Sequence, residues 1–130
     1  MFEVYGGQVK KIRDHSIKKG HIISVLKIKI NRLDANLAKE KYFELFDSLF
    51  NCISSNSRKR MDSVYVLNNN NFLVFLGNCN LKNGEKFFER IHREMKKIKA
   101  NWDYSADFFE IRPNRRFSEE QFLSFLEKDN

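Results

Sequence analysis

Along the middle of the chain, the spacing of hydrophobic residues alternates between the period of a strand and that of a helix. This alternation limits the chain to a few folds. Residues His21–Asn31 have the two-residue period of a half-buried strand, with Lys27 and Lys29 on its solvent face. The stretch from Ala38 to about Ile53 then has helical spacing. Its apolar stripe consists of Tyr42, Leu45, Phe46, Leu49 and Ile53. These patterns predict a strand followed by a helix that packs on a sheet.

Two short β-rich runs, Asp62–Leu67 and Phe72–Leu76, come next. They are joined by four asparagines: Asn68, Asn69, Asn70 and Asn71. Because Asn tolerates the positive φ that tight turns require, the two runs are predicted to form an antiparallel hairpin.

A second helix is expected over about Glu85–Lys99, after a turn at Asn83-Gly84. Its solvent face is basic, and its apolar stripe consists of Phe87 or Phe88, Ile91, Met95 and Ile98. A further strand is predicted at about Tyr104–Arg112, closed by Pro113. Ser118, followed by two glutamates, indicates the start of a last helix that runs to about Lys128.

The order strand, helix, hairpin, helix, strand predicts an α/β (α+β) domain with a ferredoxin-like βαββαβ core. Its sheet is expected to be mainly antiparallel, with the helices packed on one face. Residues 21–130 are predicted to form this single domain. Residues 1–20 are expected to be an arm, or a hairpin in which Phe2–Tyr5 pairs with Gln8–Arg13.

The composition narrows the class of protein further. The 130 residues include 24 Lys and Arg against 17 Asp and Glu, a net charge of +7, which favours an anionic partner. Thirteen Phe and a single Pro argue against disorder. No apolar run is long enough to span a membrane, and the first residues do not resemble a secretory signal, so a cytoplasmic location is expected. Cys52 and Cys79 lie too far apart for a CxxC motif and are expected to be reduced thiols near the core.

The hairpin resembles the stretch around the GGDEF signature of diguanylate cyclases. Residues Asn68–Phe72 stand where Gly-Gly-Asp-Glu-Phe would be, and of these only Phe72 is retained. The order and spacing of the elements from about Ile23 to Arg112 also match that family. The resemblance implies a GGDEF-like regulatory domain and a role in cyclic di-GMP signalling. Because no element is expected after the last helix, it also implies a trimmed or minimal version of the domain, or a part of a larger assembly.

Catalysis in that family joins two GTP molecules and uses carboxylates to hold Mg²⁺. The acidic positions of the signature are Asn70 and Asn71 in this chain, and the first-strand aspartate aligns with Lys29, or with Lys27 after a shift of two. An ammonium group cannot ligate a cation, and amide oxygens are weak substitutes for carboxylates. The resemblance therefore implies a pseudo-enzyme with no metal and no cofactor.

Many members of the family carry an inhibitory Arg-x-x-Asp site that binds cyclic di-GMP with help from an arginine of the following helix. The matching residues here are Lys59, Arg60 and Asp62, with Arg90 at the helix position. Asp62 can accept hydrogen bonds from guanine, and Arg90 can contact phosphate or guanine. Lys59 lacks the planar fork of arginine, so the affinity is expected to be reduced unless Arg58 or Arg60 replaces it.

Other interpretations stay open at this stage. The run Arg58–Arg60 also fits a solvated basic turn, and His15, His21 and His92 have no ligand or triad spacing. A protein-interaction or dimerisation domain without a nucleotide ligand is one alternative. A basic RNA-binding module is another, because Phe72 and Phe75 have opposite strand parity and one of them could lie on an open sheet face.

Overall fold

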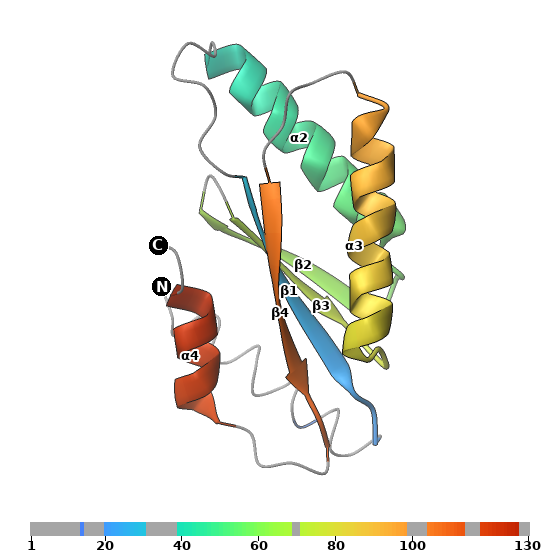
Figure 1. The fold of residues 1–130 in the computed structure, drawn as a ribbon, viewed down its shortest axis with the longest axis vertical. Helices are drawn as coiled ribbons and strands as arrows, with labels where there is room; N and C mark the ends of the chain where they lie inside the picture. The colour runs from blue at the N-terminus through green and yellow to red at the C-terminus, as the bar shows by residue number, and fades with distance from the viewer. Residues whose placement is uncertain are drawn as a thin grey trace.

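A four-stranded antiparallel sheet with the strand order β2-β3-β1-β4 forms the middle layer of the computed structural model (Figure 1). Residues 14, 20–30, 39–68, 71–98, 104–113 and 118–127 are described. Along the chain the elements are β1 (Ile23–Ile30), α2 (Lys39–Asn56), β2 (Asp62–Asn68), β3 (Asn71–Leu76), α3 (Leu81–Lys96), β4 (Tyr104–Ile111) and α4 (Glu119–Glu127). This is the predicted ferredoxin-like order, with β1 paired to both β3 and β4. The predicted arm or hairpin of residues 1–20 lies outside the described residues, apart from positions 14 and 20.

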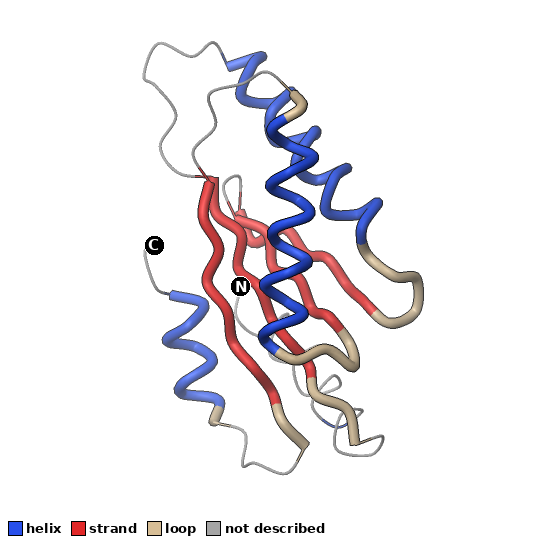
Figure 2. Tube along the Cα trace, turned by 45° about the vertical axis from the view of Figure 1, so that its right-hand side comes forward, coloured by secondary structure: helices blue, strands red, loops and turns tan. Residues whose placement is uncertain are grey.

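Helices cover both faces of the sheet, whereas the sequence predicts helices on one face only. Helices α2 and α3 lie on one side and α4 on the other (Figures 1 and 2). Under α2 and α3, Leu26 and Ile28 of β1 pack with Phe72 of β3. Under α4, the residues of β1 and β3 that point to the opposite face form a second core together with residues of β4 and α4. This core consists of Ile23, Val25, Leu73, Phe75, Ile111, Phe122, Phe125 and Leu126. The expectation was wrong because three apolar residues at helical spacing in α4 must also be buried.

The hairpin forms as predicted, with β2 and β3 antiparallel and Asn68 opposite Asn71. Its register shifts between Val66 and Asn68, the local irregularity of a β-bulge. Phe72 and Phe75 point to opposite faces, as their parity requires, but both are buried. No open aromatic face for stacked bases therefore exists at these two residues, which removes the observation that supported an RNA-binding module.

Helix α3 begins four residues earlier than predicted. Asn80 caps it, since its side-chain oxygen accepts a hydrogen bond of 2.9 Å from the Asn83 amide. Gly84, expected in a turn, lies inside the helix, where a Cβ atom would come within 3.3 Å of the Ser24 side chain. The glycine therefore lets α3 approach β1 closely. Ile98, expected on the buried stripe, follows the helix and is 42% exposed.

The start of α4 is as predicted: the amide of Gln121 donates a hydrogen bond of 3.2 Å to the Ser118 hydroxyl. Within the described part of the chain, no helix combines the length and the apolar character needed to cross a membrane.

Gly77, in the turn between β3 and α3, has no room for a side chain. A Cβ atom there would lie 2.5 Å from the backbone oxygen of Met61. We expect Gly77→Ala to lower the free energy of unfolding by about 2 kcal/mol, because backbone atoms cannot move aside as a side chain can. Gly84→Ala is the matched control and should cost less, since its neighbours are side-chain atoms and helix propensity favours Ala. Urea unfolding of both variants tests this, and equal losses would contradict it.

Candidate functional site

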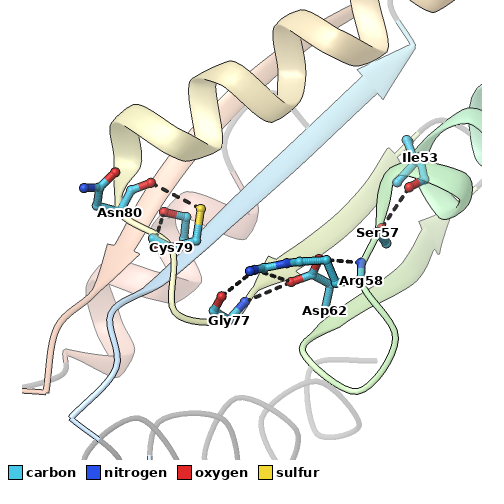
Figure 3. Close-up of polar contacts among 8 residues, drawn as sticks. Ile53, Ser57, Arg58, Asp62, Gly77, Cys79 and Asn80 are labelled. Carbon is cyan, nitrogen blue, oxygen red and sulfur yellow. Dashed lines mark hydrogen bonds and ion pairs between the residues drawn. The ribbon is translucent and has the colours of Figure 1, made fainter.

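The turn between α2 and β2 carries the basic run of the sequence. The Ser57 hydroxyl donates to the Ile53 carbonyl (2.8 Å) at the end of α2, and the chain then reverses through Arg58–Arg60 (Figure 3). Arg60 has a φ of 71°, a left-handed conformation that suits a tight turn. The Asp62 amide donates to the Arg58 carbonyl at 3.0 Å and closes the turn. Arg58 and Asp62 are thus brought face to face.

The Asp62 carboxylate accepts four hydrogen bonds from within the protein (Figure 3). Its Oδ2 accepts from the Arg58 amide (2.7 Å) and from Arg58 Nε (3.1 Å). Its Oδ1 accepts from Arg58 Nη2 (3.0 Å) and from the Gly77 amide (3.1 Å). The Asp62 side chain is only 1% exposed, against 49% for Arg58. A carboxylate has about four acceptor positions, so all of those of Asp62 are occupied. We call this arrangement the Arg58–Asp62 clamp.

A pocket of about 250 Å³ lies between the clamp and α3. The polar side chains that line it include Asn56, Arg58, Asp62, Asn83, Lys86 and Arg90. Of the ligand-binding residues predicted from the sequence, Asp62 and Arg90 lie here together. Lys59 and Arg60 are exposed and do not line the pocket, because Arg58 is the basic residue of the turn that points toward Asp62.

Lys86 also lines this pocket, although the sequence did not predict it as a site residue. It precedes Arg90 by four residues, so both lie on the same face of α3. That spacing was visible in the sequence, but the basic residues of α3 are so numerous that it did not stand out. Only the packing of α3 against β1 selects the face that meets the clamp.

The pocket carries excess positive charge. Asp62 balances Arg58, and its hydrogen bond raises the pKa of that guanidinium. Burial raises the pKa of the nearby Cys79 thiol, while the positive charges of Arg58 and Arg90 act in the opposite direction. Within the described residues, neither Lys86 nor Arg90 forms an ion pair. The pocket can therefore attract an anion.

The two lysines of β1 that align with the first-strand aspartate of the resembled family lie on the face of the sheet that α4 covers. Lys27, predicted on the solvent face of β1, is 1% exposed. Its Nζ donates to the carbonyls of Phe125 (3.0 Å) and Leu126 (3.3 Å), at the end of α4, and lies 5.8 Å from the centroid of the Phe125 ring. The prediction was wrong because α4 covers this face. Lys29, two residues along the same face, is half-buried.

These positions do not fit a divalent metal. The Lys27 ammonium is a donor and cannot ligate a cation, and Asn71 is buried while Asn70 lies outside the described residues. In the described part of the chain, no group of three His, Cys, Asp or Glu side chains is arranged to hold a metal ion.

The remaining reactive side chains have structural partners. The Cys52 thiol donates to Glu94 (3.1 Å), and burial, followed by this hydrogen bond, raises the pKa of Cys52 to about 12. His92 Nδ1 shares a hydrogen bond of 2.6 Å with the hydroxyl of Tyr104, whose pKa burial raises to about 12. A thiol that stays protonated is a poor nucleophile.

A solved protein structure has the same fold as this chain. The chain superposes on a DGC protein from Thermotoga maritima with a TM-score of 0.77, over 97% of this chain and 91% of that chain. The fold is diguanylate cyclase-like. At 15% sequence identity, this likeness extends to the architecture alone. A de novo designed protein, Foldit4, matches 73% of this chain and 98% of its own at 18% identity, with a TM-score of 0.38. No protein-family model and no curated protein matches the sequence.

Proposed function

We propose that this chain is a catalytically inactive, GGDEF-related regulatory domain that acts by binding, and that its basic pocket takes cyclic di-GMP. The observation that carries the proposal is the meeting of Asp62 and Arg90 in one pocket, although they come from β2 and α3. These residues match the inhibitory site of the resembled family. The diguanylate cyclase-like fold supports the same assignment.

The loss of catalysis is proposed from the residues at the expected metal positions. Lys27 is engaged with the end of α4, and Lys29, Asn70 and Asn71 carry no carboxylate. Purified protein incubated with GTP and Mg²⁺ is expected to make no cyclic di-GMP. Turnover above that of a buffer control would contradict this part of the proposal.

Binding is tested by calorimetric titration with cyclic di-GMP. Arg90 is exposed on α3, so Arg90→Gln should leave the fold intact while weakening binding by about tenfold through the loss of a charge-assisted hydrogen bond. Lys82→Gln is the matched control, because it removes one charge from the same helix at an exposed residue outside the pocket. No heat with the natural sequence, or equal losses in both variants, would overturn the proposed ligand.

The second candidate is a protein-interaction or dimerisation domain. It is favoured by two large hydrophobic side chains on helix surfaces, Phe43 of α2 (49% exposed) and Leu123 of α4 (40% exposed). Sedimentation of the natural sequence and of Phe43→Ser and Leu123→Ser would identify a dimer that uses these residues. A monomer at all concentrations would remove self-association.

A further inference from the structure

We infer that the basic pocket recognises a phosphate group through Lys86 and Arg90 and does not read a guanine base through Asp62. This inference concerns the pocket of the proposed function and narrows the chemical class of its ligand. It assigns Asp62 a positioning role in place of the ligand-binding role expected from the sequence.

The Asp62 carboxylate already accepts hydrogen bonds from within the protein. To bind guanine, this carboxylate must accept hydrogen bonds from the N1–H and N2–H groups of the base. All four of its acceptor positions already bind Arg58 and Gly77, and its side chain is 1% exposed. A base could reach Asp62 only by breaking a bidentate pair that the protein supplies to itself.

Two cationic side chains of α3 face the pocket. Lys86 and Arg90 are exposed, lie on one helix face, and form no ion pair with any described residue. The Arg90 guanidinium lies 5.8 Å from the centroid of the ring of Phe87, which also lines the pocket, so the two can form a cation–π contact there. Neither charge is bound in an ion pair with a described residue, although the Arg90 charge also acts on Glu94, one turn along α3. The planar fork of Arg90 suits the oxygens of a phosphate.

The pocket is small. A pocket of about 250 Å³ is below the roughly 300–1,000 Å³ of sites that enclose a drug-sized ligand. It can hold a phosphate group with the atoms next to it, but it cannot enclose two guanine bases. The side-chain amide of Asn83 adds a neutral donor to the same wall, whereas that of Asn56 already donates to the Cys52 carbonyl and to Glu94 (both 2.8 Å). The ligand class is thus a phosphate monoester or diester whose remaining part stays outside the pocket.

The test compares three probes by calorimetry: cyclic di-GMP, cyclic di-AMP and inorganic pyrophosphate. Adenine lacks the N1–H and N2–H donors of guanine, so the two dinucleotides should bind with dissociation constants within about threefold of each other if phosphate alone is read. Pyrophosphate should compete with both. Lys86→Gln should weaken all three probes by about tenfold, and Lys82→Gln should change none by more than about twofold.

The outcomes separate this inference from the proposed function. Binding of pyrophosphate and cyclic di-AMP without preference for cyclic di-GMP would support the inference and remove cyclic di-GMP as the specific ligand. Binding of cyclic di-GMP alone, unaffected by pyrophosphate and by Lys86→Gln, would overturn the inference and keep the proposed function. Absence of binding by all three probes would overturn both.

Discussion

Replacing Lys27 by alanine is expected to lower the free energy of unfolding by about 3 kcal/mol. The substitution leaves the carbonyls of Phe125 and Leu126 without their buried donor and opens a cavity under α4. Lys27→Met fills most of that volume and should lose about half as much. Urea unfolding measures both. Lys82→Ala, at an exposed position of α3, is the control and should change stability by less than about 0.5 kcal/mol.

A loss for Lys27→Ala no larger than for the surface control would contradict a role of this ammonium in holding α4. Lys27→Asp is the sharper variant, because it places a carboxylate against two carbonyl oxygens and directly opposite Asp107 in the register of β1 and β4. Like charges opposite one another destabilise a sheet. An aspartate at Lys27, the position that aligns with the acid of the resembled cyclases after a shift of two, should therefore unfold the domain.

Asp62→Ala is expected to cost about 3 kcal/mol as well. The substitution removes the side-chain acceptor of the Arg58 amide, leaves the Gly77 amide with only the Met61 carbonyl (3.1 Å) and breaks the ion pair of a carboxylate that is 1% exposed. Arg58→Ala should cost less, since the Arg58 backbone amide and Gly77 still bind the carboxylate. The coupling between the two substitutions, measured by a double-mutant cycle in urea, should reach about 1–3 kcal/mol.

Additive losses, with no coupling, would show that the clamp contributes nothing as a pair. The expected instability also affects how ligand experiments are designed. A loss of binding in Asp62→Ala would report an unfolded turn as readily as a lost contact, so the exposed residues Lys86 and Arg90 are the better positions for testing recognition.

The local structure was largely readable from the sequence because each signal acts within a few residues. The buried stripe ending at Ile53, the antiparallel pairing of β2 with β3 and the Ser118 cap are as predicted, while Asn69 and Asn70 of the turn lie outside the described residues. The start of α3 was misplaced because Asn83-Gly84 is typical of a turn. The helix begins after the Asn80 cap, and Gly84 within it allows α3 to lie close to Ser24, a residue 60 positions earlier. No local pattern records that distance.

The candidate site was predictable only in part. The resemblance to a known family singled out Asp62 and Arg90, which do line one pocket, but it favoured Lys59 over Arg58. Which of the three consecutive basic residues points inward depends on the left-handed conformation of Arg60 and on the Gly77 carbonyl, which accepts a hydrogen bond from Arg58 and lies on another turn. Lys86 was missed for the same reason: its face of α3 is defined by contacts with distant strands.

By itself, the sequence determined the order of the elements, the pairing of the hairpin and the basic character of α3, because hydrophobic period, turn residues and charge are local properties. Only the tertiary structure decided that α4 covers the second face of the sheet, that Lys27 is buried beneath it and that Asp62 is occupied by Arg58. Each of these depends on which segments meet in space. A lysine that alternates with isoleucines has the same sequence pattern whether water or the end of a helix lies above it, and only the position of that helix decides its role.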